Sequence, residues 1–306
     1  MNMDLSTSRT ALLARSQEIG AGLAGFLGGL WELMESIEPL DWQPGDPDET
    51  WEKVREENSY FFAIDAPALT AEYIAPIFDR VFDYVAPATP GLGEQVCAEV
   101  KAVVAGLSDA DVRIGLADAA RLMRLITGRL KQLPKGDDPL SAMAAVHLSV
   151  ISALSPTATA AAAKLQVPER KTLALEDGHC PVCGRPADIG AIEEAPEGHG
   201  GKRHLWCSFC GATWDYERIR CTRCGTRVQS ELTFHFNEDD RARRIYYCKS
   251  CSGSQKIVAL GDLASLTDFD LRVESVVMAG LEDAVSKHNE QLLSPTPAGL
   301  KTEQES

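Results

Sequence analysis

The chain has 306 residues, of which 44% are hydrophobic and 25% are charged, and its formal net charge is −15. This length suits two or three domains with separate cores, and the apolar fraction is typical of soluble globular proteins. The isoelectric point near 4.9 disfavours nucleic acid as the main partner, because phosphate binding needs a basic surface.

Residues 1–170 are predicted to form an acidic, all-α helical bundle. Apolar residues recur every three or four positions, as within residues 73–85, and clusters of Pro and Gly separate the periodic stretches. Ser108, with Asp111 three residues later, is a predicted helix start. Residues 1–179 carry 15 basic and 26 acidic side chains, a net charge of −11.

We expect no export signal and no membrane span. The first 20 residues mix acidic and basic side chains instead of placing a basic segment before an apolar one. The uncharged run 139–163 is long enough for a bilayer, but it is rich in Ala, Ser and Thr, and Pro156 interrupts it. We interpret it as a buried helix, a break and a short second helix. The expected location is the cytoplasm, where thiols stay reduced.

The sequence changes in character from His179 onward. Short runs of β-branched and aromatic residues alternate with turns, as in the predicted strands 228–236 and 245–247, which a polar turn at 237–240 separates. Residues 263–293 are predicted to form a C-terminal helix, and residues 294–306 a disordered tail.

Eight of the nine cysteines form four Cys-x-x-Cys pairs. The pairs are Cys180/Cys183, Cys207/Cys210, Cys221/Cys224 and Cys248/Cys251. The first and second pairs start 27 residues apart, as do the third and fourth, and the second unit repeats the first at an offset of 41. The duplication predicts two metal units, 178–219 and 220–262, each closed by four cysteines. Cys97 stands alone and is interpreted as a buried thiol.

The paired cysteines suit a metal ion in each unit. A Cys-x-x-Cys turn directs two sulfur atoms at one centre, and two such turns supply a tetrahedron. Four thiolates accept zinc or a single iron equally well; disulfides, thioredoxin-like redox motifs and an iron–sulfur cluster are weaker alternatives. Each unit is too small to bury a sufficient core, so metal binding is expected to supply folding energy.

The residue after each cysteine pair is a second part of this pattern. Gly184, Gly211 and Gly225 follow three of the pairs, at a position where a positive φ is often needed. Ser252 follows the fourth pair, so that turn is expected to have a different shape.

Arginines are frequent around the cysteines, and residues 180–251 carry a net charge of +1. Two divalent ions bound by eight thiolates would change this local charge to roughly −3. We therefore expect the arginines to balance the metal centres or the neighbouring acidic helices rather than to bind nucleic acid.

The sequence from Leu205 to Gly225 is Leu-Trp-Cys-Ser-Phe-Cys-Gly-Ala-Thr-Trp-Asp-Tyr-Glu-Arg-Ile-Arg-Cys-Thr-Arg-Cys-Gly. This segment resembles the formate dehydrogenase accessory protein family, FdhE. The preceding Cys180-Pro-Val-Cys-Gly184 does so too, and the likeness covers residues 178–251. It implies a cytoplasmic maturation factor or chaperone with a helical domain and two rubredoxin-like metal sites. It also implies that all eight paired cysteines bind metal, and that the partner is the catalytic subunit of formate dehydrogenase. The chain departs from the family at residues 252–256.

The expected fold class is therefore α+β: an N-terminal all-α helical bundle, a tandem rubredoxin-like or zinc-ribbon module, and a C-terminal helix. The expected function is assembly of active formate dehydrogenase through a metal-stabilised scaffold. The alternatives are a rubredoxin-like electron carrier and a nucleic-acid-binding zinc ribbon. We expect no enzymatic activity, because no Ser/His/Asp motif, phosphate-binding Gly loop or open metal position is evident.

Overall fold

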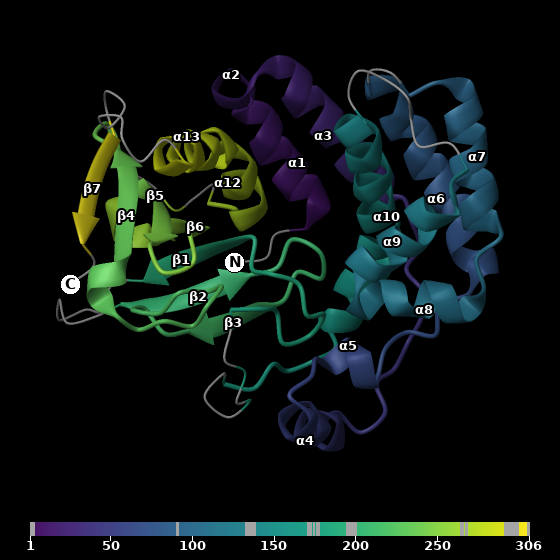
Figure 1. Cartoon of the computed structure of the whole chain (residues 1–306), viewed down its shortest axis with the longest axis horizontal. Helices are drawn as coiled ribbons and strands as arrows, with labels where there is room; N and C mark the ends of the chain where they lie inside the picture. The colour runs from purple at the N-terminus through teal and green to yellow at the C-terminus, as the bar shows by residue number, and fades with distance from the viewer. Residues whose placement is uncertain are drawn as a thin grey trace.

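The computed structural model of the chain describes residues 4–89, 92–131, 139–169, 173, 175, 178–193, 201–263, 266, 269–290 and 300–304. A helical domain lies beside a sheet, and two C-terminal helices pack on the sheet (Figure 1). The predicted α+β class, with N-terminal helices, a cysteine-rich sheet region and C-terminal helices, is confirmed.

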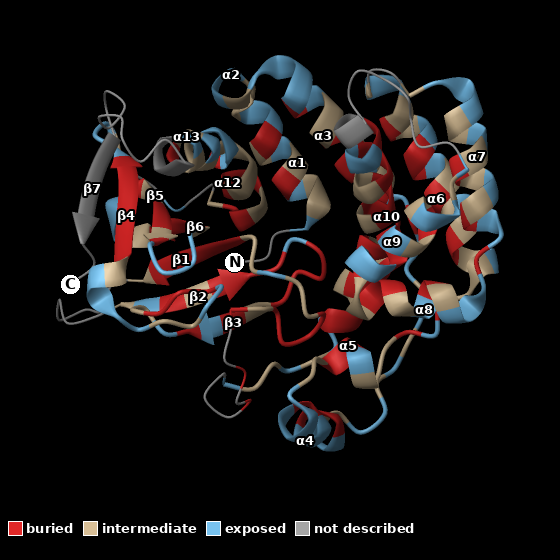
Figure 2. Cartoon of the chain, in the orientation of Figure 1, coloured by how far each residue is buried: buried red, intermediate tan, exposed pale blue. Residues whose placement is uncertain are grey.

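The helical domain extends to residue 162. Its α-helices are α1 (Leu5–Ala14), α2 (Ser16–Ile19), α3 (Ala21–Glu35), α4 (Pro47–Glu57), α5 (Phe61–Ile64), α6 (Ala71–Val85), α7 (Glu94–Ala105), α8 (Asp109–Ala117), α9 (Ala119–Arg129) and α10 (Pro139–Ala162). Their apolar faces point inward, where Figure 2 shows the buried residues. Helix α8 begins as predicted, because Ser108 and Asp111 form a reciprocal capping box.

Helix α10 is continuous, so the break predicted at Pro156 is wrong. Proline removes one backbone donor from a helix. Ala153, Leu154 and Ala158 are nevertheless buried on either side of it, and their packing keeps the helix intact. Within the described residues, Ala142–Ala162 is long and apolar enough to cross a membrane, but 61% of its most apolar window is buried inside the protein, as in a core helix.

The second half of the chain is built on one seven-stranded sheet in the order β3-β2-β1-β6-β5-β4-β7. The strands are β1 (Ile189–Glu193), β2 (Lys202–Trp206), β3 (Thr213–Tyr216), β4 (Leu232–Asn237), β5 (Asp240–Cys248), β6 (Gly253–Ala259) and β7 (Leu300–Gln304). Strands β1 to β3 are antiparallel neighbours, as are β4 to β6. The two groups join where β1 pairs in parallel with β6, with Ile189 opposite Lys256. The predicted metal units therefore share a sheet.

Two helices, α12 (Leu271–Val277) and α13 (Ala279–Glu290), cover one face of this sheet. A cluster of buried side chains lies between them and the strands: Ile189, Ala191, Trp206, Ile245, Val258, Leu271, Met278 and Val285. The sequence predicts one helix over 263–293. Helix α12 instead begins at Leu271, because the Asp270 side chain accepts the backbone N–H groups of Arg272 and Val273 as an N-cap.

The C-terminal strand β7 pairs antiparallel with β4. The sequence predicts a disordered tail over 294–306, and within it residues 300–304 are extended. Without β7, the outer edge of β4 would present unpaired backbone groups, and an extended segment can satisfy them whatever its sequence. Residues 291–299 and 305–306 of the predicted helix and tail lie outside the described residues.

Candidate metal centres

The eight paired cysteines gather in the two groups that their spacing predicts, and within each group the sulfur atoms lie within 4.8 Å of one another. In the first group, the Sγ atoms of Cys180 and Cys210 are 3.6 Å apart, and those of Cys183 and Cys207 are also 3.6 Å apart. Each of these short distances joins one Cys-x-x-Cys turn to the other, so both turns face one centre.

The second group repeats this arrangement. The Sγ atoms of Cys221 and Cys251 are 3.7 Å apart, and those of Cys224 and Cys248 are also 3.7 Å apart. The fourth turn joins β5 to β6, which pair with each other up to Cys248 opposite Gly253. The third turn packs against it, with the Arg223 side chain next to Gly253.

Both groups have the dimensions of a four-thiolate metal site. A tetrahedral ion with metal–sulfur bonds of about 2.3 Å holds its sulfur atoms roughly 3.8 Å apart. Disulfide bonds would need sulfur atoms about 2.05 Å apart, and all nine cysteines are free. The described residues therefore fit one metal ion in each group. Tetrahedral sulfur coordination suits zinc and iron alike, so each group fits either metal.

All four cysteine turns contain a residue in the left-handed region. The φ angles are 74° at Gly184, 71° at Gly211, 71° at Gly225 and 56° at Ser252. The expectation that the Ser252 turn has a different shape is therefore wrong. The turn needs this backbone geometry to point both sulfur atoms at one centre, and Ser252 adopts it at a cost of about 1 kcal/mol relative to glycine.

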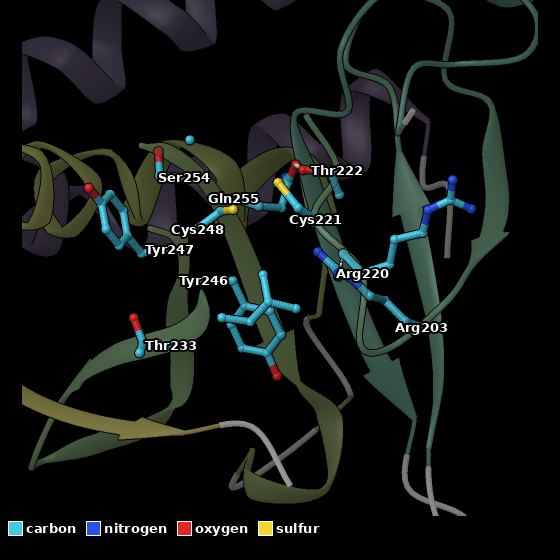
Figure 3. A pocket seen from close by; sticks show the side chains of 12 residues that line it. Arg203, Arg220, Cys221, Thr222, Thr233, Tyr246, Tyr247, Cys248, Ser254 and Gln255 are labelled. Atoms are coloured by element: carbon cyan, nitrogen blue, oxygen red, sulfur yellow. Dashed lines mark hydrogen bonds between the residues drawn. The ribbon is translucent and has the colours of Figure 1, made fainter. Parts of the chain in front are cut away.

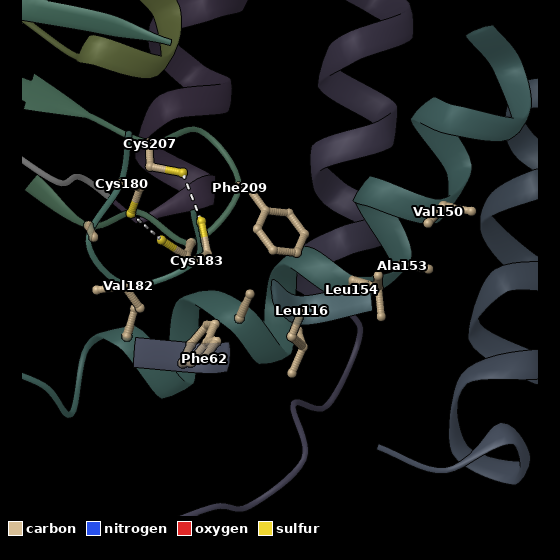
Figure 4. Packing of buried hydrophobic residues seen from close by; sticks show 14 of the residues in the cluster. Phe62, Leu116, Val150, Ala153, Leu154, Cys180, Val182, Cys183, Cys207 and Phe209 are labelled. Carbon is tan, nitrogen blue, oxygen red and sulfur yellow. Dashed lines mark hydrogen bonds between the residues drawn. The ribbon is translucent and has the colours of Figure 1, made fainter. Parts of the chain in front are cut away.

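The helical domain holds the first centre through backbone hydrogen bonds. At the start of α5, the N–H of Phe61 donates to the carbonyl of Pro181 at 3.0 Å, and the N–H of Phe62 donates to that of Val182 at 2.8 Å. Both acceptors lie between the cysteines of the first turn. Figure 4 shows Phe62 and Val182 beside the sulfur atoms, within one continuous buried cluster.

Two further contacts complete this attachment. The Ser155 hydroxyl of α10 donates to the carbonyl of Phe209, inside the second cysteine turn, at 2.7 Å. The Tyr60 ring packs on Gly184, where a Cβ atom would lie only 2.5 Å from the ring. The helical domain therefore contacts both turns of the first centre.

The two centres differ in their access to solvent. In the first, Cys180 and Cys183 are fully buried and Cys207 and Cys210 are 1% exposed. In the second, the two turns each contribute one buried and one exposed cysteine, and Cys224 and Cys251 are the exposed ones. The second centre therefore has an open edge.

The inner side of the second centre adjoins a cavity of about 20 Å³ (Figure 3). The Thr222 hydroxyl donates to the Gln255 side-chain oxygen at 3.1 Å along its wall, and both residues are buried. The cavity thus leaves room for little more than about one water molecule beside the second centre.

Without a cation, the first group cannot carry four negative charges. Burial raises the pKa of the Cys183 and Cys210 thiols well above the usual value, whereas hydrogen bonds, foremost from Cys180, lower the pKa of Cys207. In the second group, burial raises the pKa of Cys251 to about 12. Metal binding therefore has to displace protons from the thiols whose pKa is raised.

One charged neighbour of the first centre has no signal in the sequence. The Arg272 guanidinium lies 5.3 Å from the ring centre of Trp206 and 5.8 Å from that of Trp31. Burial lowers its pKa, and the negative charges of Asp270, Asp188 and Cys207 oppose this effect. A positive charge thus sits beside the first cysteine group, but only tertiary packing brings it there.

Several arginines around the cysteines pair with carboxylates. Glu217 accepts from Arg227 at 2.6 Å and from Arg220 at 2.8 Å, and these contacts lower the pKa of Glu217 to about 2. Arg243 donates to Glu274 of α12 at 2.6 Å. These pairs leave fewer guanidinium groups for phosphate.

Comparison with known proteins connects this site to one family. Residues 179–218, which include the whole first cysteine group, match the family model described as FdhE, central domain. A protein FdhE homolog of Aquifex aeolicus is 30% identical over 108 residues, which are 35% of this chain and 34% of that protein. A protein FdhE homolog of Shewanella baltica is 37% identical over 98 residues, 28% of this chain and 31% of that protein. The chain thus matches about a third of these curated relatives' lengths.

The fold is also similar to a solved structure. The crystal structure of the FdhE protein from Pseudomonas aeruginosa has a TM-score of 0.60 with this chain at 20% sequence identity. The likeness covers 97% of this chain and 95% of that one. Together, the sequence match in the centre and the similarity of fold over nearly the whole chain confirm the resemblance seen in residues 178–251.

Proposed function

We propose that the chain is an accessory protein required for the assembly of active formate dehydrogenase, because its centre matches the FdhE family model and its fold is similar to that of an FdhE protein. It binds the catalytic subunit of that enzyme before the enzyme is complete, as a maturation factor. It acts in the cytoplasm, where its eight paired thiols stay reduced and available for metal.

In this proposal each cysteine group binds one ion of iron or zinc, and the eight paired cysteines are the ligands. The ions fix the four turns and thereby the shared sheet. The observation that carries the proposal is the assembly of both sulfur tetrads in one sheet, with the first tetrad held by backbone hydrogen bonds from the helical domain. Metal binding is thus linked to the mutual arrangement of the two halves of the molecule.

The proposal assigns no catalysis to this chain. Each group offers four protein sulfur atoms to one ion, which completes a tetrahedron and leaves no position for a substrate. A site of this kind serves to stabilise structure or to transfer electrons.

A genetic complementation experiment tests the proposed function. We expect loss of formate dehydrogenase activity when the gene is deleted, and recovery with the wild-type gene or with Cys97→Ser. A gene carrying Cys180→Ser and Cys207→Ser should not restore activity, since the first tetrad is then broken. Full activity in the deletion strain would contradict the proposal, as would full recovery with the tetrad variant.

Electron transfer is the second candidate, and the open edge of the second centre favours it. Cys224 and Cys251 are exposed, so a redox partner could approach within a few ångströms of a bound iron. Anaerobically purified protein that is red and bleaches with dithionite would support this candidate. Colourless protein with two equivalents of zinc would exclude it.

A further inference from the structure

A cleft of about 1010 Å³ lies between the helical domain and the first metal unit. Its walls come from α5 and the loop after it, from the junction of α8 and α9, from α10, and from residues 184–186 behind the first cysteine turn. Apolar side chains make up much of the surface: Tyr60, Phe62, Ile64, Pro67 and Ile114. Ligand pockets commonly measure about 300–1,000 Å³, so this cleft is large enough for several residues of a peptide.

Three arginines surround this apolar surface. Arg113 is on α8, Arg121 is in the first turn of α9, and Arg185 follows the first cysteine turn; the His147 imidazole of α10 lines the cleft as well. Among the residues that the structure describes, Arg113, Arg121 and Arg185 form no ion pair with a carboxylate. The Arg185 guanidinium instead lies 5.1 Å from the ring centre of Phe209.

The one carboxylate in the described cleft lining already has hydrogen-bond and ion-pair partners outside the cleft arginine side chains. Asp118 accepts the backbone N–H of Arg121 at 2.8 Å as the N-cap of α9, and it also lies 3.6 Å from Arg124. It therefore does not neutralise the guanidinium groups that face the cleft. The positive end of the α9 dipole adds to their charge.

This arrangement is unusual for such an acidic chain. The net charge is −15, and residues 1–179 contribute −11, yet three arginines without a carboxylate partner among the described residues line one cleft. Burial lowers the pKa of His147, and the Arg185 charge lowers it further, so these two groups repel each other when both are protonated. An anionic group placed between them would relieve this repulsion.

We propose that the cleft binds an acidic, extended peptide segment of the partner protein. Its apolar side chains would pack on the surface formed by Tyr60 and Ile64, and its carboxylates would pair with Arg113, Arg121 and Arg185. Guanidinium groups suit this role because they bind carboxylates with two parallel hydrogen bonds. The inference rests on the proposed function, since the partner is the catalytic subunit of formate dehydrogenase.

The test measures the affinity of the purified full-length chain, loaded with metal, for the purified catalytic subunit. The key variant carries Arg113→Glu and Arg121→Glu. Both residues are exposed, so the reversal does not remove buried contacts. The matched control is Arg55→Glu, an exposed arginine on α4 that is not in the cleft lining. Circular dichroism and metal content confirm that all variants are folded.

We expect at least a tenfold loss of affinity in the double variant and less than a twofold change in Arg55→Glu. A client segment whose acidic residues are changed to lysine should recover affinity for the double variant. If the double variant binds as tightly as the wild type, the cleft proposal fails and the accessory function stands. If the wild type does not bind the catalytic subunit at all, both proposals are contradicted.

Discussion

Ser252 shows how strongly the metal site dictates a single backbone angle. Its φ of 56° matches the left-handed glycines of the other three turns, although serine carries a Cβ atom that disfavours this region. The chain therefore carries a small strain next to Cys251, one of the exposed cysteines. Strain of this kind is open to a direct test, because glycine relieves it without changing any ligand.

We expect Ser252→Gly to stabilise the metal-loaded protein by about 1 kcal/mol, since glycine adopts positive φ without steric cost. Thermal unfolding at fixed metal concentration measures the change. Ser250→Gly is the control, because Ser250 lies in the same turn without a positive φ. It should not stabilise the protein, and equal stabilisation by both variants would contradict the argument.

Glu217 is a second single residue of interest, because its contribution to the stability of the folded protein depends on pH. Arg227 and Arg220 lower its pKa from 4.5 to about 2, so the carboxylate is favoured in the folded state. Its stabilising effect is present above the unfolded value near 4.5 and is lost as the pH falls through about 2. The Glu217 side chain is 49% exposed, so solvent screening limits the effect to about 0.5–1 kcal/mol.

We therefore expect Glu217→Gln to be less stable than the wild type by about this amount at pH 7. The difference should persist down to pH 5 and narrow below about pH 4.5. Urea unfolding at several pH values measures it, with the exposed Glu52→Gln of α4 as control. A difference that stays constant across this pH range would refute the assignment.

At the scale of elements, one carboxylate joins three distant segments. Glu274 of α12 is 3% exposed and pairs with Arg15, between α1 and α2, and with Arg243 of β5. These contacts attach the N-terminal helices to the sheet through α12. Removing a buried carboxylate that has two cationic partners lowers the stability of the protein strongly, because the remaining positive charges are left without compensation.

Replacement of Glu274 by Gln is expected to destabilise the protein by about 3 kcal/mol. Glu18→Gln is the matched control, since Glu18 also pairs with Arg15 but its side chain is 51% exposed. The control should cost less than about 1 kcal/mol. Chemical unfolding of the metal-loaded variants compares them, and equal losses would show that burial of Glu274 does not matter.

The cysteine turns of the two units should release metal at different rates. The first centre is enclosed by the sheet and by α5 and α10, whereas Cys224 and Cys251 of the second are exposed. With excess chelator, we expect two phases of about one equivalent each, the faster one from the second centre. Cys221→Ser with Cys248→Ser should remove the fast phase. If the slow phase disappears in this variant instead, the second centre releases its metal more slowly than the first, contrary to our expectation.

For the whole molecule, the sequence predicted what depends on local spacing. The pairing of the cysteines followed from the repeated interval of 27 residues, and the helix start at Ser108 followed from its capping pattern. Both signals lie within a few residues or within a duplicated unit. These features were therefore visible without the structure.

Contacts between distant segments were not visible in the sequence. The parallel pairing of β1 with β6, the backbone bonds from Phe61 and Phe62 to the first turn, and the position of Arg272 join segments that are far apart in the chain. Local patterns carry no information on such partners. The helix break predicted at Pro156 was wrong for a related reason, because tertiary packing outweighed the local helix-breaking preference of proline.

The metal content of the purified protein shows whether both cysteine groups bind an ion. We measure metal equivalents per chain in the wild type, in Cys180→Ser with Cys207→Ser, in Cys221→Ser with Cys248→Ser, and in Cys97→Ser as control. We expect two equivalents in the wild type and in Cys97→Ser, and one in each double variant. A wild-type chain without metal, or double variants that still hold two equivalents, would contradict it.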